Sequence, residues 1–483
     1  MLNFKVVIRT WGALLLIESV FILLSAMVSL FYNESDFYYF LLSAGICMAV
    51  GGSAYLSTKN ASRNMGIREG YIIVALVWVV FSFFGLLPFW LSNAIPSFTD
   101  AFFETMSGFT TTGSSILNNI EEMSHGVLFW RSITQWLGGM GMVVLSLAVL
   151  PMLGGGGIQL FDAEVPGLSS DKLQPRITDT ARQLWLLYVA LTLLQTVLLV
   201  FGGMSVFDAI CHSFTTMATG GYGTKQASVA YWNSPYIQYV ISAFMFIAGV
   251  NFTLIYAVSR KRWAKIKGND EFRFYLISVL LFTLVVTIGL LIRSNGINVE
   301  QSFRDALFQV VSIMTTTGFA TVDYMLWSPL LISVVFLLMF FGGSAGSTAG
   351  GIKIARVFLL IKNSTNEMRR LVHPNAVIPV RLNGRAVPQP MLYSVLAFVV
   401  LYLLIVGLST IVMSSMGYDL QTSLGAVATS IGNIGPGLNE LGPAFTFSDV
   451  PAFGKWFLSI LMLVGRLELF TVIILFTPSF WKH

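Results

Sequence analysis

The sequence predicts an all-α integral membrane protein with four tandem repeats of helix, re-entrant loop and helix, preceded by two extra N-terminal transmembrane helices. Of the 483 residues, 55% are hydrophobic and 11% are charged, whereas about 25% are charged in an ordinary soluble protein. Apolar runs of about 20 residues, the length that an α-helix needs to cross the hydrocarbon core, recur along the chain. A short glycine-centred stretch occurs four times.

The first domain, residues 1–69, is expected to hold the two extra transmembrane helices, at about 10–31 and 38–57. The amino end carries Lys5 and Arg9 before an apolar run, as a signal peptide does. This run is long for a signal peptide, lacks a clear small-residue cleavage site and is followed closely by a second span. We therefore expect a retained helix.

Each of the four repeats contains a long apolar helix, a short amphipathic segment, the glycine loop and another apolar helix. Their expected bounds, counting the cytoplasmic connections with the second and fourth repeats, are 70–153, 154–258, 259–361 and 362–483. The result is ten spanning helices and four half-crossing segments such as Ala101–Thr110 and Ala306–Thr315. These segments are too short to span the membrane and too apolar for a surface loop. They fit re-entrant helices, because irregular backbone at membrane depth is tolerated where it is buried in protein or lines a cavity.

The clearest copy of the repeated loop is Thr219-Gly220-Gly221-Tyr222-Gly223, which differs at one position from the Thr-Val-Gly-Tyr-Gly loop of potassium channels. Each central glycine lies thirteen residues after an aspartate, which puts the four copies in one register. The other three copies are Thr111-Thr112-Gly113-Ser114-Ser115, Thr316-Thr317-Gly318-Phe319-Ala320 and Ser430-Ile431-Gly432-Asn433-Ile434.

The repeated loop has the residue types that a dehydrated cation needs. Consecutive backbone carbonyls can replace its water shell, a central glycine allows unusual backbone conformations, and threonine or serine can add a hydroxyl oxygen. Four copies predict a pseudo-fourfold ring, so the fold is four helix–pore loop–helix units. The candidate ion ligands are Thr111, Thr112, Gly113, Thr219, Gly220, Gly221, Thr316, Thr317, Gly318, Ser430, Ile431 and Gly432.

The four aspartates are expected at the starts of the pore helices, near the outer mouth of the ring. There they would complement the positive helix ends and leave negative charge at the entrance. Plain N-capping is an equally good interpretation, and the two roles are compatible. The residues are Asp100, Asp208, Asp305 and Asp419.

The placement of Lys and Arg predicts the orientation independently of the loops. Most of these residues lie in the termini and in the connections between repeats, such as Arg260–Arg262 and Arg369–Arg370, while the loop side is poor in them. Cytoplasmic segments carry an excess of Lys and Arg. Both termini are therefore expected in the cytoplasm, and the glycine loops are expected to enter from outside.

Over essentially its whole length the sequence resembles the membrane subunit of the Trk/Ktr/HKT potassium transporters, and its two extra spans resemble the bacterial Trk type. The resemblance implies a homodimer with one pore per subunit in the bacterial inner membrane. It also implies a cytosolic regulatory subunit that binds a nucleotide, with no covalently bound cofactor on this chain. Within the family, serine at the first filter glycine accompanies sodium permeation, so Gly113 favours potassium as the transported ion.

A glycine-rich tract, Gly342–Gly351, interrupts the second helix of the third repeat. It lacks the Gly-Lys-Ser/Thr spacing of a phosphate-binding loop and follows an apolar span instead of a strand. In the family this segment obstructs the pore below the filter, so a mobile gate is expected; the alternative is close helix packing through small residues. The gate glycines are Gly342, Gly343, Gly346, Gly350 and Gly351.

Arg466 lies inside the last apolar span, where ionisable residues are costly and commonly functional. Glu468 is two residues away and does not share its helix face, so Arg466 needs another partner. The family resemblance implies an electrostatic barrier beside the gate loop; a structural salt bridge between helices is the alternative.

Several function classes are disfavoured. Cys47, Cys211 and the scattered histidines form no disulfide framework or metal spacing, and no catalytic constellation is apparent, so the chain is not expected to be an enzyme. Nothing in it points to nucleic acid. The remaining alternative to a channel-like uptake protein is a secondary transporter that couples potassium to sodium or protons. The argument against this alternative is that the chain is expected to lack the intramembrane acidic residues that such coupling often uses.

Overall fold

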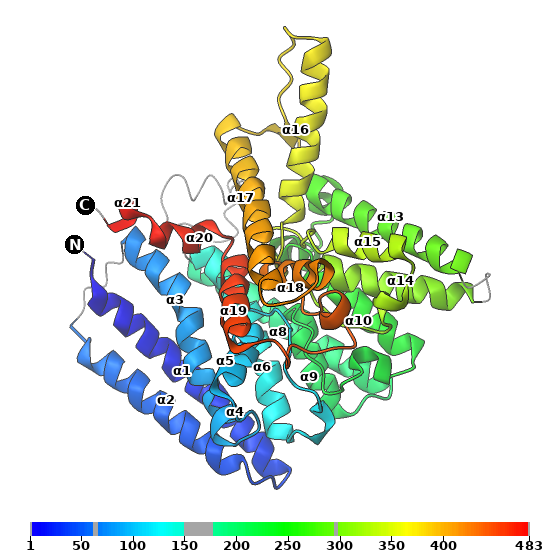
Figure 1. Ribbon diagram of the computed structural model, residues 1–483. Coiled ribbons are helices and arrows are strands. Elements are labelled where there is room, and N and C mark those ends of the chain that lie inside the picture. The colour runs from blue at the N-terminus through cyan, green and yellow to red at the C-terminus, as the bar shows by residue number, and fades with distance from the viewer. Residues whose placement is uncertain (1, 61–65, 149–176, 294–297, 482–483) are drawn as a thin grey trace.

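The computed structural model describes the chain except residues 1, 61–65, 149–176, 294–297 and 482–483. The described part is almost entirely helical (Figure 1). Its only strands form a two-residue antiparallel hairpin, β1 (Arg381–Leu382) with β2 (Arg385–Ala386). The sequence-based prediction of an all-α fold is confirmed.

The two extra helices, α1 (Phe4–Phe31) and α2 (Phe37–Ser57), form a hairpin on one flank of the molecule, drawn in blue in Figure 1. They approach closely where Gly12 faces Gly51. A Cβ on Gly12 would lie 2.8 Å from the carbonyl oxygen of Gly51, and the reverse distance is 2.9 Å. These small residues thus let the backbones of α1 and α2 touch, as they do where helices pack together in membranes.

Each repeat has a first helix, a shorter inner helix, a loop and a second helix or helix pair. The first repeat contains α3 (Ile67–Gly85), α4 (Leu87–Leu91), α5 (Phe98–Phe109), η1 (Ile120–Glu122) and α6 (His125–Ala148). The second contains α8 (Ile177–Phe201), α9 (Val206–Met217), η3 (Ser228–Tyr231), α10 (Pro235–Ala248) and α11 (Phe252–Ser259), followed by α12 (Ala264–Lys267).

The third repeat contains α13 (Asp270–Arg293), α14 (Val299–Met314), η4 (Tyr324–Leu326), α15 (Pro329–Leu338) and α16 (Ile354–Val372). The fourth contains α17 (Gln389–Ser414), α18 (Leu420–Gly432), η5 (Asn439–Leu441), α19 (Ala452–Arg466), α20 (Phe470–Ile473) and η6 (Ile474–Phe476), and α21 (Pro478–Trp481) ends the described chain. Helix α16 projects from the body of the molecule and crosses the expected boundary at residue 361 (Figure 1). The expected boundary at residue 153 lies outside the described residues.

Four inner helices, α5, α9, α14 and α18, are the expected half-crossing segments, and a polar residue caps each N-terminus. Ser97 and Ser205 accept the backbone N–H three residues on, and Asn298 and Asp419 do the same. A cap satisfies one of the donors that the first helical turn leaves unpaired. Asp305 differs from the expectation, because α14 begins at Val299 and Asp305 lies in its second turn.

Within the described residues, three of the four second helices are interrupted, whereas a break was expected only in the third. Helices α10 and α11 meet at 106°, and α19 and α20 meet at 111°. In the third repeat an irregular segment, residues 339–353, separates α15 from α16. At the last break Glu468 and Leu469 both have left-handed φ angles, 56° and 52°, which L residues seldom adopt.

Six helices in the described residues are long and apolar enough to span a membrane, and the two bent pairs raise this number to eight. The prediction of ten spans also counts α6 and the interrupted α15–α16 segment. Large hydrophobic side chains lie exposed along α1, α2, α13 and α17, as a lipid-facing surface requires.

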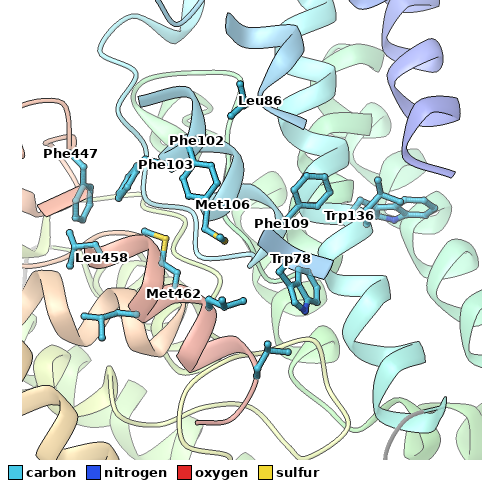
Figure 2. Packing of buried hydrophobic residues seen from close by; sticks show 14 of the residues in the cluster. Trp78, Leu86, Phe102, Phe103, Met106, Phe109, Trp136, Phe447, Leu458 and Met462 are labelled. Atoms are coloured by element: carbon cyan, nitrogen blue, oxygen red, sulfur yellow. The ribbon is translucent and has the colours of Figure 1, made fainter. Parts of the chain in front are cut away.

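The main hydrophobic core surrounds the first inner helix. Figure 2 shows Phe102, Phe103, Met106 and Phe109 of α5 between Trp78 and Trp136 on one side and residues of the fourth repeat on the other. Phe102 stacks on Trp456 at 4.4 Å between ring centroids. Because α5 is packed on all sides, its carboxyl end and the loop that follows have little freedom to move.

Candidate functional site

The four loops leave their inner helices with the same backbone geometry. In each, a loop N–H donates to a carbonyl five residues earlier at 2.8–3.0 Å. One left-handed residue precedes this donor, with φ of 53–55°, and a glycine with positive φ follows it. The equivalent triplets are Thr111-Thr112-Gly113, Thr219-Gly220-Gly221, Thr316-Thr317-Gly318 and Asn433-Ile434-Gly435.

The prediction for the fourth loop is therefore wrong by three residues. Ser430, Ile431 and Gly432 form the last turn of α18, and the structural counterpart is Asn433–Gly435. The thirteen-residue spacing misled because Asp419 is itself the N-cap of α18, whereas Asp100 and Asp208 are three residues past theirs. Measured from the cap, the central glycine is sixteen residues away in the first, second and fourth repeats.

The loops close into a ring in chain order. A Cβ on Gly113 would collide with the carbonyl oxygen of Gly220 in the next loop, and one on Gly435 would lie 3.0 Å from the carbonyl oxygen of Thr112. Gly221 and Gly318 have the same relation to the loops that follow them. Each glycine thus packs on a neighbouring backbone carbonyl, so a larger residue in this structure would require neighbouring loops to move apart.

Hydroxyl groups at two expected ligand positions are used inside the protein. The hydroxyls of Thr112 and Thr317 pair with those of Thr110 and Thr315, each at 2.8 Å. The hydroxyls that remain candidates for an ion belong to the preceding residues. Thr111 Oγ1 is buried without a hydrogen-bond partner among the described residues.

Side chains from α6 and the fourth loop brace the ring. Gln135 donates to the carbonyl of Gly220 at 2.7 Å and accepts from the N–H of Tyr222 at 3.0 Å. Asn433 donates to Thr112 Oγ1 and to the carbonyl of Met462, both at 2.9 Å. The ring is fourfold in backbone pattern, but its support differs from loop to loop.

A buried ion pair, missed by the sequence-based predictions, lies behind the first two loops. Glu104 of α5 and Arg131 of α6 are 2.6 Å apart, with side-chain exposures of 0% and 3%. Glu104 also accepts from the N–H of Ile116, and Arg131 donates to the carbonyl of Gly223 and covers the Tyr222 ring at 3.6 Å. A glutamate and an arginine within apolar segments were the sequence signal that could have revealed this pair. A buried ion pair is costly unless it is fully hydrogen-bonded.

The four aspartates that were expected at the outer mouth do not form a uniform negative ring. Asp100 pairs with Lys455 of α19 at 2.6 Å, which offsets its charge. Asp208 accepts from the hydroxyls of Thr224 and Ser205 at 2.6 and 2.8 Å. Hydrogen bonds from Thr422, the largest influence, lower the pKa of Asp419.

The segment 342–351 folds back on itself beside the ring. Its two ends meet where Gly342 donates to the carbonyl of Ile352 at 2.8 Å. Gly346 and Gly351 have φ angles of 70° and 65°. A Cβ on Gly343 would lie 2.8 Å from Ala349 Cβ, so the loop is compact.

The loop is attached to several repeats. Ala345 donates from its N–H to Glu271 at 2.7 Å, and its carbonyl accepts from Asn251 at 2.6 Å. Thr348 donates to the carbonyl of Met217 at the end of α9. Gly350 donates to Thr316 Oγ1 at 2.7 Å. The loop thus contacts both the second repeat and the third loop of the ring.

Arg466 is 1% exposed, and its partners are backbone carbonyls. It donates to Thr348 in the 342–351 loop at 2.7 Å and to Gly138 of α6 at 3.2 Å. Glu468 pairs with Arg356 at 2.6 Å instead. Within the described residues Arg466 forms no ion pair, so its charge is held against the loop without a carboxylate.

The expected lack of intramembrane acidic residues is wrong. Besides Glu104, Glu18 lies in the middle of the spanning helix α1 and is 1% exposed. Glu271, the second residue of α13, is 2% exposed at the end of its span. Neither carboxylate oxygen of Glu18 has a hydrogen-bond partner among the described residues. Both cysteines are buried and unpaired, and the described residues contain no group of three potential His, Cys, Asp or Glu metal ligands.

Comparisons with known proteins cover the whole chain. A family model described as "TrkH: Cation transport protein" matches residues 39–483. The Trk system potassium uptake protein TrkH of Escherichia coli K12 is 40% identical over 488 residues, and TrkG of the same organism is 36% identical over 482. These alignments cover 100% and 99% of each chain respectively. The crystal structure of the potassium transporter TrkH from Vibrio parahaemolyticus superposes with a TM-score of 0.91 at 37% identity, covering 100% of both chains.

Proposed function

Because this chain belongs to the TrkH family of cation transport proteins, we propose that it carries potassium inward through the ring formed by its four loops. Like the other members of this family, the chain is an integral membrane protein of potassium uptake and is not an enzyme.

The observation that carries the proposal is the closed ring in one backbone register. Four loops with equivalent hydrogen bonds and φ angles meet in sequence order, each glycine against the next carbonyl. Such a ring can present carbonyl oxygens from four directions, the number that potassium filters use. The carboxyl ends of the four inner helices precede the loops, and their dipoles favour a cation.

The membrane potential is a sufficient source of energy for this transport. Moving one elementary charge through 100 mV is worth about 2.3 kcal/mol, so a resting potential drives inward accumulation without a second energy source. Gly113, where sodium-permeable members of the family carry serine, supports potassium as the ion. Potassium is then the cargo, and no covalently bound cofactor is needed.

We assign the gate to the 342–351 loop, hereafter the gate loop, and the electrostatic barrier to Arg466. The loop lies against the third loop of the ring through Gly350 and Thr316. Arg466, which forms no ion pair within the described part of the chain, places its guanidinium at the carbonyl of Thr348 within the gate loop. A cation leaving the ring on this side would meet that positive charge, which supports a closed state.

The assembly proposal follows the family resemblance and the charge pattern. The chain would form a homodimer in the bacterial inner membrane, with both termini in the cytoplasm. The projecting α16 and the basic segments beside it would face the cytosolic regulatory subunit, which would supply the nucleotide site. Nucleic acid has no part in this proposal.

One observation favours a second candidate, a transporter that couples potassium to protons. Glu18 is a buried carboxyl without a hydrogen-bond partner among the described residues, and intramembrane acidic groups are common in proton relays. Against this candidate, Glu18 belongs to α1 on the flank of the molecule, outside the four repeats that form the ring.

Potassium-limited growth tests the function directly. A bacterium that lacks its own potassium uptake systems is expected to grow at low potassium when it expresses this chain, and better with a regulatory subunit. Replacing Gly113 by serine is expected to reduce the preference for potassium over sodium. A chain that reaches the membrane in normal amounts but never restores growth, with or without the partner, would contradict the proposal.

A further inference from the structure

We propose that Thr316 couples the ring to the gate loop: a cation at the inner end of the ring and the closed loop compete for its hydroxyl oxygen. This inference rests on the proposed function and adds a regulatory role for one ring residue. Thr316 Oγ1 accepts a hydrogen bond of 2.7 Å from the N–H of Gly350, and Thr316 is 0% exposed.

Thr316 belongs to a set of four equivalent left-handed residues, and their side-chain oxygens differ in use. Thr111 Oγ1 and Asn433 Oδ1 are buried without hydrogen-bond partners among the described residues. Thr219 donates its hydroxyl to the adjacent carbonyl of Ala218 at 2.6 Å. Thr316 is the member whose oxygen accepts from the gate loop. Two unpartnered oxygens at equivalent positions mark this level of the ring as suited to a cation.

Gly350 lies against the inner end of the ring at a second point as well. A Cβ there would collide with the carbonyl oxygen of Gly432 and would lie 3.1 Å from Asn433 Oδ1. The loop therefore reaches both the third and the fourth loops of the ring through its backbone. A glycine is required at this position because any side chain would push the loop away.

The electrostatics make the two states exclusive. An N–H directed at Thr316 Oγ1 places partial positive charge beside that oxygen, and a cation that uses the same oxygen would lie close to it. The guanidinium of Arg466, bound to Thr348 in the same loop, adds a full positive charge. The closed loop thus disfavours a cation at the inner end, and by linkage a cation there disfavours the closed loop by the same factor.

Two variants separate the two roles of the hydroxyl. Thr316→Val removes a ring hydroxyl and leaves the N–H of Gly350 unpaired in the closed state only. Thr111→Val removes the equivalent hydroxyl in the first loop, which forms no hydrogen bond with the gate loop among the described residues. Thr316→Ser keeps the hydroxyl and serves as the conservative variant. Gly350→Ala tests the same contact from the loop side, because its Cβ would collide with the carbonyl oxygen of Gly432 and push the loop away.

The experiment records single-channel currents from the full chain in planar bilayers while potassium on the loop side is varied at constant ionic strength with N-methylglucamine. Open probability of the wild type and Thr316→Ser is expected to rise with potassium. Thr316→Val is expected to raise the open-to-closed ratio at low potassium by about five- to a hundredfold, the factor for an unpaired buried donor, and to weaken the potassium dependence of opening. Gly350→Ala is expected to change opening in the same direction, because its side chain pushes the loop away from the ring. Thr111→Val is expected to lower the unitary conductance and keep the potassium dependence of opening.

Equal effects of Thr316→Val and Thr111→Val on opening would overturn the coupling. So would a wild-type open probability that does not depend on potassium. If the wild type conducts potassium but shows either result, the proposed function stands and this inference fails. If the wild type conducts no potassium with or without a regulatory subunit, both fail.

Discussion

Several ionisable side chains in this protein lie where hydrocarbon or tightly packed protein surrounds them. Arg466 is held by two carbonyls, and Glu18 by no hydrogen bond among the described residues. Glu104 is held by Arg131 and also accepts from the hydroxyl of Ser115 and the N–H of Ile116. A buried charge is costly unless its partners are well placed. These three side chains therefore have different roles, and a substitution at each one tests its role.

Arg466→Ala tests the electrostatic barrier. Removing a unit charge beside the ion path lowers a barrier of a few kcal/mol at an effective dielectric constant of about 20, so potassium uptake per folded molecule is expected to rise about tenfold or more. Potassium uptake into proteoliposomes measures this effect. The uptake is divided by the amount of folded variant, which size-exclusion chromatography gives.

Arg466→Lys is the matched control, because it keeps the charge and should keep uptake low. If the alanine variant folds poorly and shows no gain in uptake per folded molecule, Arg466 is structural.

Glu104→Gln tests the ion pair behind the ring. The change leaves the Arg131 guanidinium buried without its counter-ion, which typically costs about 3–5 kcal/mol of stability. We expect a lower melting temperature and, because Arg131 also holds Gly223 and Tyr222, a lower potassium-to-sodium permeability ratio. Glu122→Gln, at an exposed position, should change neither.

The double variant Glu104→Gln with Arg131→Met should recover much of the lost stability, since it removes the orphaned charge. Recovery of stability together with wild-type selectivity would show that the pair does not position the ring.

At the scale of elements, the sequence predicted the repeats, the inner helices and the irregular tract in the third repeat. It could not place the fourth loop, because an aspartate can be either the cap of a helix or a residue of its first turn, and the thirteen-residue spacing fits both. It also could not foresee the bends after α10 and α19. Those bends depend on long-range partners, such as Arg356 with Glu468, that no local pattern encodes.

Shortening the gate loop tests its obstruction of the path. Deleting residues 343–350 joins Gly342 to Gly351, and these are already close, since a Cβ on Gly351 would lie 3.3 Å from the Gly342 Cα. The deletion is expected to raise potassium flux severalfold because the hydrogen bond to Thr316 and the site for Arg466 are both removed. Unchanged or lower flux in a deletion variant that is well folded would count against gating.

Glu18→Gln in α1 distinguishes transport through the ring alone from proton coupling. A fully buried carboxyl without a hydrogen-bond partner is most stable in its neutral form, and Gln is the neutral isostere of that form, so Glu18→Gln is expected to keep thermal stability and potassium uptake unchanged. Proton movement can be followed with a trapped pH dye during potassium uptake. A potassium-dependent proton flux in the wild type that the Gln variant loses would support coupling.

Across the whole molecule, the flank formed by α1 and α2, the ring, and the projecting α16 occupy separate regions (Figure 1). Composition and span length were enough to predict the membrane class, because hydrocarbon imposes the same requirement on every span. The asymmetry of the ring was harder to predict from the sequence. Its four loops share one backbone register, yet Gln135, Asn433 and the gate loop support different members.

The reversal potential of the purified chain in planar bilayers tests the central claim most directly. The potassium gradient is varied first, and the sodium and proton gradients are then varied at fixed potassium. Transport through a potassium-selective ring predicts a shift of about 59 mV per tenfold change in the potassium gradient and almost none with the other two ions. A reversal potential that moves in fixed proportion with sodium or protons would contradict the account.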